Sequence, residues 1–506
     1  MLSTVVFLPV AVAVALLAVP RVSDAVVRWT WVAASAVELV AVVVLWLGYD
    51  GPGYGYEVNR RWIPSVSSGY HIGVDGLSLP LVAVTAVLFL ACAVYALRRT
   101  APGTGREAPS GARQTSTLRS FAALFLLLET VCMGVFVSLD LVLFFVFFDL
   151  SIVVMYFVIA GWGHRDAARA ALQFFLYTFL GSLALLLGFI GLYLAATPHT
   201  FDIARLAAQN PLQGRGTAAT LVLVAIVVGL AIKTPTVPFH TWLPPAHTEA
   251  PAEGSAILAG VLLKLGTYGF VRIAMPLLPG PWRDWGAAIV VVGVVSVLYG
   301  ALVALAQRDF KRMIAYTSVN HMGYVILALG AAGLLSTSDS QAHDLAVTGA
   351  VTQMVSHGLI TGALFLLAGV LYERGGTYDL DAYGGLAASA PRFAGLTALA
   401  AFASLGLPGF SGFIAEFQIF TGSLPGAPVA TALAFLGILL TAALFLRAYQ
   451  RLFLGPPASR VGDLTLAETL SIAPLMALAV VLGLFPRFLL DLVEPAARVL
   501  GTLVRR

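Results

Sequence analysis

The chain has 506 residues, of which 59% are hydrophobic and only 11% charged, and its mean hydropathy is +0.92. Because soluble domains average roughly 25% charged residues, this composition excludes a soluble globular protein and indicates a polytopic membrane protein. The net charge of +4 is spread over the connecting loops without a basic stripe, which argues against nucleic acid as a partner.

The predicted fold is an all-α membrane protein with about fourteen transmembrane helices, because apolar runs of the ~20 residues that cross a bilayer take up nearly the whole chain. The helices are expected near residues 2–20, 26–48, 74–97, 118–139, 140–162, 168–195, 217–243, 255–277, 286–306, 313–334, 345–371, 392–421, 427–454 and 467–488. This arrangement leaves no room for a soluble domain.

The first three helices form an N-terminal region over residues 1–117. Its opening stretch, residues 2–20, has no basic leading region and no convincing cleavage site, so we interpret it as a spanning helix and not as a signal peptide. The polar, low-complexity segment 98–119 is interpreted as a mobile cytoplasmic linker. Lysine and arginine concentrate in the loops on one side of the predicted topology, which indicates that both chain ends lie on the outer side.

Two of the predicted helices contain residues that interrupt a helix. The seventh is broken around Pro235 and Pro238, and the twelfth around Pro408, Gly409 and Gly412. Such breaks free backbone groups that hydrocarbon cannot satisfy, so they persist only where they line protein or a water-filled cavity. A single membrane proline can also be a packing kink, but two breaks in matching positions favour a transport site.

The two breaks lie five helices apart, which predicts two five-helix repeats. We place the first half-channel at residues 118–277 and the second at residues 286–454, followed by a C-terminal helix and tail at 467–506. A repeat with an odd number of crossings inserts its second copy upside down, so the two halves are expected to be inverted relative to each other.

Ionisable residues recur at membrane depth through both repeats. A charge at the centre of a spanning helix costs at least ~2.5–3.5 kcal/mol, which is a heavy penalty for a mere scaffold. The candidate proton-translocating residues are Asp149, Lys233, Lys264, His321, His357 and Glu416.

The use of lysine supports this interpretation. Only three of the 29 basic residues are lysine, and Lys233 and Lys264 lie inside long apolar stretches. Arginine effectively never releases its proton, whereas a buried lysine can. Lysine at membrane depth in a chain that otherwise uses arginine therefore indicates proton transfer in preference to simple charge.

Each candidate also has a structural interpretation that the residues alone leave open. The ammonium of Lys233 can reach the membrane surface along its alkyl stem. His321 and His357 can be hydrogen-bonded core histidines, and Glu416 can cap the half-helix that follows the second break. Asp149 can pair with an arginine, although none lies in the apolar part of its own or the adjacent helix.

Three further residues are secondary candidates. Glu129 lies mid-helix in the first repeat, while His240 and His247 flank the break in the seventh helix, where water access or half-helix capping can explain either. Glu38 is also mid-helix, but it lies outside both repeats and we interpret it as structural.

Cofactor chemistry is not expected in the chain itself. Only two cysteines occur, Cys92 and Cys132, and neither belongs to a CxxC pair or a Cys/His cluster. An iron–sulfur or zinc site is therefore not expected. Glycine-rich nucleotide loops that follow a strand are also absent, so we expect no NADH, metal or other cofactor to bind this chain.

Three sequence motifs carry a resemblance to a known family. They are IKTPTVPFHTWLPPAHTEAPAEGSAILAGVLLKLGTYG, QRDFKRMIAYTSVNHMGYV and HGLITGALFLLAGVLYERGGTYDLDAYGGL. They resemble the antiporter-like subunits of the proton-translocating NADH–quinone oxidoreductase, respiratory complex I, and the similarity extends from about Tyr70 to about Gly455. Within the family the subunit M branch, the counterpart of mitochondrial chain 4, matches best. That branch carries glutamate where Glu416 stands, and no long lateral helix follows residue 488, which argues against subunit L.

The resemblance implies that Asp149 and Lys233 form a switch pair between the fifth and seventh helices. The family usually has glutamate at the position of Asp149. The shorter side chain lacks one C–C bond of ~1.5 Å. Direct contact with Lys233 is therefore not assured, and a bridging water or a shifted helix would compensate.

The resemblance also assigns roles to the remaining candidates. Lys264 is implied to be the central proton relay, His321 and His357 extend the polar axis, and Glu416 passes the proton to the outer half-channel.

The family implies a setting as well. Flavin, iron–sulfur clusters and quinone would be held by other subunits, and the partners would be the lipid bilayer and other membrane subunits, including sister antiporter-like chains, in a bacterial plasma membrane. Two alternatives remain: a subunit of a multisubunit sodium/proton antiporter, which uses the same scaffold, and a membrane scaffold whose polar residues have lost their function.

Overall fold

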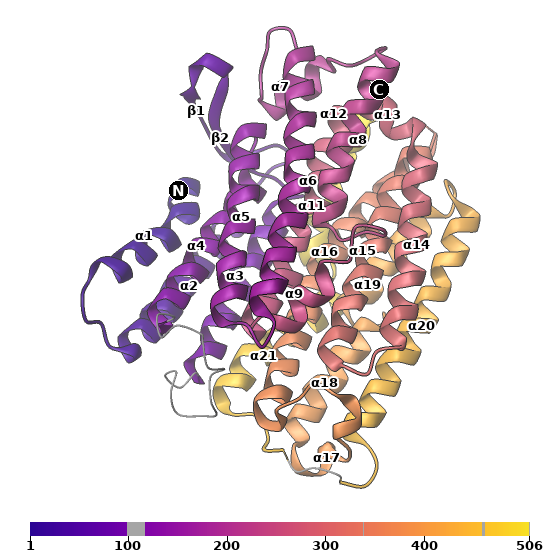
Figure 1. Cartoon of the computed structure of the whole chain (residues 1–506). Coiled ribbons are helices and arrows are strands. Elements are labelled where there is room, and N and C mark those ends of the chain that lie inside the picture. The colour runs from indigo at the N-terminus through magenta and orange to yellow at the C-terminus, as the bar shows by residue number, and fades with distance from the viewer. Residues whose placement is uncertain (99–116, 337, 458–460, 505–506) are drawn as a thin grey trace.

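The computed structural model describes residues 1–98, 117–336, 338–457 and 461–504. The predicted cytoplasmic linker at 98–119 lies almost wholly outside these residues. Helices dominate the described chain, and Figure 1 shows them packed side by side, from the indigo helices α1 (Leu2–Ala18) and α2 (Asp24–Leu47) at one edge to α14 (Gly286–Leu305) and α20 (Pro428–Phe453) at the other.

The elements in chain order begin with α1 (Leu2–Ala18), α2 (Asp24–Leu47), β1 (Gly55–Ile63), η1 (Pro64–Val66), β2 (Ser68–Val74), α3 (Leu79–Tyr95), η2 (Ala96–Arg98), α4 (Leu118–Val137) and α5 (Leu141–Trp162). The middle of the chain contains α6 (Ala167–Ala195), α7 (Ile203–Gln209), α8 (Gly216–Lys233), α9 (Leu243–Glu249), α10 (Ala252–Ile257), η3 (Leu258–Leu262), α11 (Leu263–Gly269), η4 (Phe270–Ala274), α12 (Met275–Leu277) and α13 (Pro279–Asp284). The last part contains α14 (Gly286–Leu305), α15 (Phe310–Leu334), α16 (Ser340–Gly375), η5 (Leu380–Ala382), α17 (Leu386–Ser389), α18 (Pro391–Ser404), α19 (Ser411–Ser423), α20 (Pro428–Phe453), α21 (Leu466–Leu484) and α22 (Arg487–Val504).

Among the described residues, eleven helices are long and apolar enough to cross a membrane, and α1 is apolar but shorter. The predicted class, a mainly helical membrane protein, is therefore confirmed. Several elements were not predicted from the sequence, among them short helices such as α7 and two longer elements. One is the antiparallel hairpin β1–β2, in which Val58 lies opposite Ile72. The other is α22, which turns the predicted C-terminal tail into a helix that ends at Val504.

Both predicted interruptions are present. Helix α8 ends at Lys233 and α9 begins at Leu243, because Pro235 and Pro238 have no N–H to continue the ladder. The second interruption separates α18 from α19, and Gly406 and Gly409 within it have φ of +67° and +99°. Glycine is the residue that adopts these left-handed conformations without strain.

The interior of the bundle is formed by the continuous segment from α10 to α12 and by the central part of α16, residues 346–371, all of which are buried. Two π-helical turns, η3 and η4, flank α11 within that segment. Such turns are frequent at functional sites. Glycines bring other helices close together, since a Cβ on Gly293 of α14 would lie 2.5 Å from the Leu327 backbone nitrogen of α15.

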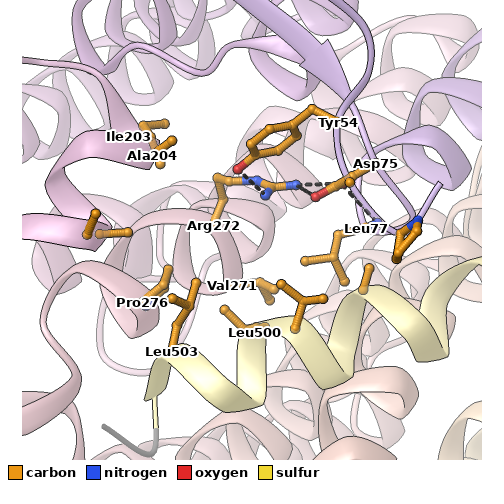
Figure 2. A pocket seen from close by; sticks show the side chains of 16 residues that line it. Tyr54, Asp75, Leu77, Ile203, Ala204, Val271, Arg272, Pro276, Leu500 and Leu503 are labelled. Carbon is orange, nitrogen blue, oxygen red and sulfur yellow. Dashed lines mark hydrogen bonds and ion pairs between the residues drawn. The ribbon is translucent and has the colours of Figure 1, made fainter.

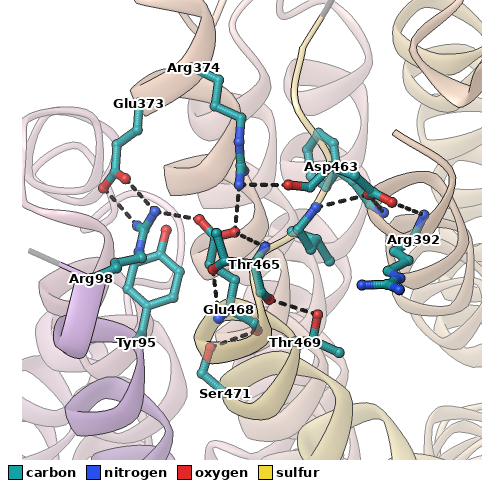
Figure 3. A network of polar contacts seen from close by, with 12 residues as sticks. Tyr95, Arg98, Glu373, Arg374, Arg392, Asp463, Thr465, Glu468, Thr469 and Ser471 are labelled. Atoms are coloured by element: carbon teal, nitrogen blue, oxygen red, sulfur yellow. Dashed lines mark hydrogen bonds and ion pairs between the residues drawn. The ribbon is translucent and has the colours of Figure 1, made fainter. Parts of the chain in front are cut away.

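An ionic cluster ties three helix ends together (Figure 3). Arg98 at the end of η2 pairs with Glu373 and donates to Glu468 Oε1 at 2.6 Å, and Arg374 donates to Glu468 Oε2 at 2.6 Å. Glu468 also completes a capping box with Thr465 at the start of α21. The cluster therefore fastens α3, α16 and α21 to one another at one end of the bundle.

A second polar cluster surrounds Arg272 in η4, the turn that follows α11. There the Arg272 guanidinium donates to Asp75, Tyr54 and Tyr268. Figure 2 shows Tyr54, Asp75 and Arg272 beside a cavity, with Leu500 and Leu503 of α22 in its apolar wall. The cavity has a volume of about 370 Å³. The arginine is charge-paired and buried, and it joins the loop before α3 to η4.

Candidate functional site

Lys233 is the last residue of α8 and borders the first helix break. Its side chain is only 1% exposed, and its Nζ donates to Ser151 Oγ of α5 at 2.9 Å. The same ammonium lies 5.0 Å from the centroid of the Phe148 ring. The alternative in which Lys233 reaches the membrane surface is not what the structure shows, because the ammonium is held inside the bundle.

Asp149, the implied partner of Lys233, is half-buried on α5. Its Oδ1 is buried and has no hydrogen-bond partner within the described ranges. Lys233 bonds Ser151 and not this carboxylate, so the two charges act on each other through space and not through an ion pair. The structure therefore brings the two residues into one neighbourhood without direct contact.

Lys264 on α11 lies in the wholly buried core and is 1% exposed. Its Nζ donates to the carbonyl oxygen of Ala259 in the π-helical turn η3. It also lies 2.6 Å from Nδ1 of His357 on α16, which is hydrogen-bond distance. The central lysine and one of the two predicted histidines are thus in direct contact.

The two histidines of the series are neighbours, and each has a different environment. His357 Nε2 lies 3.2 Å from Ser318 Oγ of α15, so both of its ring nitrogens have partners. The ring centroids of His357 and His321 are 5.4 Å apart. His321 Nδ1 is buried without a hydrogen-bond partner among the residues the structure describes.

A small cavity extends the series to α19. It has a volume of about 10 Å³ and is lined in part by His321, His357, Ser404 and Glu416. This is close to the ~10–15 Å³ that a cavity needs to hold one buried water molecule. One water at this site would lie among polar groups from four helices, α15, α16, α18 and α19, and would connect the histidines to the glutamate.

Glu416 is held against the second helix break. The residue is 6% exposed, and a Cβ placed on Gly406 would lie 2.1 Å from Glu416 Oε2. Only glycine fits at residue 406, because any side chain there would meet the carboxylate and would also have to adopt a φ of +67°. The break therefore places the Glu416 carboxylate against the Gly406 backbone, and does not merely end a helix.

The secondary candidates differ among themselves. Both ring nitrogens of His247 lack a hydrogen-bond partner in the described part of the chain, and its ring stacks on Phe365 with centroids 4.4 Å apart. The electrostatic neighbours of His247 are Lys264 and Lys311. His240 lies apart from this group, with its ring 4.9 Å from Tyr299.

Glu129 lies away from the main series, next to the N-terminal helices. Its Oε2 accepts a hydrogen bond from Ser35 Oγ of α2 at 3.2 Å, while its Oε1 has no described partner. Glu38, one turn after Ser35, is fully buried, and neither of its carboxylate oxygens has a described partner. No described hydrogen bond therefore supports the interpretation of Glu38 as structural.

Sequence analysis missed the third lysine. Lys311 lies in the first turn of α15, beside charged residues that suggest a solvated helix end, yet its exposed fraction is 0%. Ser151 and Ser318, which hydrogen-bond Lys233 and His357, were also missed, because serines are common in helices and their partners come from other helices. The scarcity of lysine was the one signal that pointed to Lys311.

The described contacts thus form two groups. The first group lies on α11, α15, α16 and α19 and consists of Lys264, His357, His321 and Glu416. Lys233 and Asp149 form a separate group on α5 and α8. Histidine and lysine in contact, inside a core that excludes bulk water, can pass a proton between nitrogen atoms.

Known proteins place this arrangement in a family. The family described as NADH:quinone oxidoreductase/Mrp antiporter, TM, matches residues 138–441, more than half of the chain. The chain belongs to this family. The matched residues span both helix breaks and all six of the main candidates, so the predicted resemblance is confirmed.

Members of the family with curated names are similar over nearly the whole chain. NADH-quinone oxidoreductase subunit M of Rickettsia bellii is 38% identical over 91% of this chain and 89% of that protein. NADH-quinone oxidoreductase subunit M of Rhodobacter capsulatus is 37% identical over 98% and 95%. The F(420)H(2) dehydrogenase subunit M of Methanosarcina mazei is 37% identical over 86% and 85%.

Solved structures of family members have the same fold. A chain of respiratory complex I from Thermus thermophilus superposes with a TM-score of 0.88 at 31% identity, and the match covers 100% of both chains. A chain of the Mrp complex from Dietzia sp. DQ12-45-1b superposes with a TM-score of 0.85 at 22% identity, covering 100% of this chain and 99% of that one. The Mrp match shows the shared fold alone.

Proposed function

We propose that the chain is the M subunit of an NADH–quinone oxidoreductase and translocates protons, driven by quinone reduction elsewhere in the assembly. It contributes to the enzyme as a proton translocase and carries out no redox step itself. The observation that carries this proposal is the 2.6 Å contact between Lys264 and His357 in the wholly buried core.

The contact supports proton transfer because of the two residue types involved. A protonated lysine donates to a neutral imidazole nitrogen, and the hydrogen-bond distance is short enough for the proton to move along it. A second imidazole follows at a centroid distance of 5.4 Å, and a cavity of about one water's volume leads on to Glu416. A protein that served only as a scaffold would gain nothing from these residues, because each buried charge raises the free energy of membrane insertion.

Lys233 and Asp149 would act as the switch of the first half. Moving the carboxylate toward or away from the ammonium changes how strongly the lysine holds its proton, since an opposite charge within ~4–6 Å favours the charged form. The absence of a described ion pair between them fits a resting state in which the pair is open.

The finer architecture is part of the proposal. Eleven helices qualify as candidate spans, and α1, α15 and the interrupted pair α18–α19 would complete fourteen crossings. Helix α15 has the length of a span, but polar residues such as Asn320 and His321 reduce its hydropathy. The inverted half-channels at 118–277 and 286–454 would then each contain one interruption, with residues 1–117 and 467–506 outside them.

The partners and setting follow from the relatives. Respiratory complex I and the Mrp complex are both multisubunit membrane assemblies, so the partners would be other membrane subunits, including sister antiporter-like chains, within the lipid bilayer. Flavin, iron–sulfur clusters and quinone would reside in those other subunits. The membrane would be the bacterial plasma membrane.

A multisubunit sodium/proton antiporter is the second candidate function. The Mrp superposition favours it at the level of the fold. The complex I chain is more similar in sequence, at 31% against 22% identity, and the curated relatives share 37–38%. We therefore rank the oxidoreductase subunit first.

The variant Lys264→Ala tests the proposal in the assembled complex. Reconstituted into vesicles, the variant should move protons at least about a hundredfold more slowly than the parent, the usual contribution of one acid–base group. Acidification of the lumen during quinone reduction gives the readout, and NADH oxidation by a water-soluble acceptor reports complex content.

The matched control for this experiment is Arg312→Lys, because Arg312 is exposed in the first turn of α15. Normal pumping by Lys264→Ala at normal complex content would contradict the relay role and favour the scaffold. Vesicles that exchange sodium for protons without quinone reduction would instead favour the antiporter.

A further inference from the structure

The third lysine is buried as deeply as the other two. The exposed fractions are 1% for Lys233, 1% for Lys264 and 0% for Lys311, in a chain whose other 26 basic side chains are arginine. Arg308 and Arg312, on either side of Lys311, are both exposed. The chain therefore places arginine at the surface positions and lysine at the one buried basic position of this segment.

Lys311 lies next to the loop that joins α14 to α15, which has exposed and half-buried residues. The loop that joins α14 to α15 pairs with the segment before η5, since Phe310 N donates to Tyr378 O and Leu380 N donates to Arg308 O, both at 2.8 Å. Asp309 in the same loop is half-buried. The lysine is thus buried one residue away from groups that water reaches.

Lys311 is hydrogen-bonded to the segment that follows His247. Its Nζ donates to the carbonyl oxygen of Ala250 at 2.6 Å, and Ala250 follows His247 by three residues, which is about one helical turn. Asp309, Glu249 and Glu253 act on the ammonium through space. The described hydrogen bond of this buried cation is therefore to a neutral carbonyl, which does not fix its charge as a carboxylate contact would.

His247 provides the link to the central lysine. Both of its ring nitrogens lack a hydrogen-bond partner among the described residues, so both are available to accept or donate a proton. Lys311 and Lys264 both act on the His247 ring through space. Stacking on Phe365, with rings 9° from parallel, holds the imidazole in place.

We propose that Lys311 is a further proton-relay residue, which passes protons between the face at the α14–α15 loop and Lys264 through His247. In this step an N–H bond of the Lys311 ammonium breaks as an N–H bond forms on one ring nitrogen of His247. The opposite ring nitrogen then releases its proton toward the neutral amine of Lys264, directly or through water. This inference rests on the proposed function and adds the entrance to its central relay.

The decisive variant is Lys311→Arg in the assembled complex. Arginine keeps the positive charge and can still donate to the Ala250 carbonyl, but it does not release its proton. We expect normal complex content and NADH oxidation by a water-soluble acceptor, together with loss of proton pumping in vesicles. Arg312→Lys, one residue away and exposed, should pump as the parent does.

A second variant covers the case in which Lys311→Arg does not assemble. His247→Phe keeps the stacking on Phe365 and removes both ring nitrogens, and His247 has no described hydrogen bond to lose. It should assemble and lose pumping. Normal pumping by an assembled Lys311→Arg complex, or by His247→Phe where the first variant fails, would overturn the proposal.

The outcomes separate this inference from the proposed function. If Lys264→Ala stops pumping while Lys311→Arg pumps normally, the central relay stands and only the entrance through Lys311 is wrong. If Lys264→Ala itself pumps normally, the proposed function is the part that fails.

Discussion

Polar groups around Lys264 touch one another, whereas those around Lys233 are spaced apart. Lys264 is 2.6 Å from His357, which is 3.2 Å from Ser318, and a water-sized cavity leads on to Glu416. Lys233 has one hydrogen bond, to Ser151, and no contact with the Asp149 carboxylate. The groups around Lys264 are already in contact with one another, whereas Lys233 and Asp149 would need movement or a bridging water to meet.

The difference follows from which helices are exposed. Lys264 and His357 lie on α11 and on the buried central part of α16, which cannot shift without repacking the core. Asp149 is on α5, and α5 and α8 each have exposed apolar side chains, for example Phe157 and Leu221. A helix packed on one face only can move more easily, which suits a switch.

The largest effect is expected where the groups are in contact. His357→Leu removes the acceptor 2.6 Å from Lys264 and leaves that ammonium with a single carbonyl partner. Proton pumping should be lost, by about a hundredfold or more. Vesicle acidification measures it, with complex content determined in the same preparation. His240→Leu, which lies outside the contact series, is the comparison, and equal losses in both variants would contradict the compact relay.

A smaller, graded effect is expected at the single hydrogen bond of the first half. Ser151→Ala leaves the buried Lys233 ammonium without its described partner, which costs about 1–3 kcal/mol. Pumping should slow without stopping, because the water or carboxylate that completes the switch can still reach the lysine. The measurement is the pumping rate at matched complex content.

Ser318→Ala supplies the matched serine variant in the other half, where His357 keeps its contact with Lys264. It should slow pumping less than Ser151→Ala does. The reverse order would show that the first half does not depend on Ser151 and that the two halves are more alike than their contacts suggest.

The smallest change is expected from Asp149→Glu. The added C–C bond of ~1.5 Å brings the carboxylate toward Lys233 and should allow an ion pair that the native chain lacks. Pumping should stay within about twofold of the parent, since the switch keeps both charges and shifts by well under ~1 kcal/mol. A cryo-EM map of the variant would show whether the ion pair forms, and an unchanged separation would contradict this account of the first half.

Much of the fold was predictable because the signals are local. Apolar runs marked the helices, and Pro235, Pro238 and Pro408 marked the two interruptions, since proline removes a backbone donor wherever it stands. The hairpin β1–β2 was missed because its residues Tyr56 to Trp62 mix polar and apolar types, and its stability depends on pairing with residues that follow.

The candidate site was predictable in its members but not in its contacts. Charge at membrane depth identified Lys264, His321, His357 and Glu416, whereas their distances depend on how α11, α15, α16 and α19 pack. The burial of Lys311 had the same cause. Its local sequence resembles a solvated helix start, and only the approach of the Ala250 carbonyl from another segment makes it an interior residue.

The ionic cluster of Arg98, Glu373, Arg374 and Glu468 limits the movement of α16 (Figure 3). It holds one end of α16, the long central helix that carries His357, to η2 and α21. Ion pairs at that end oppose any sliding of α16 along its axis. Proton transfer is therefore expected to depend on rearrangement of side chains and water around a fixed α16, and not on movement of α16 along its axis.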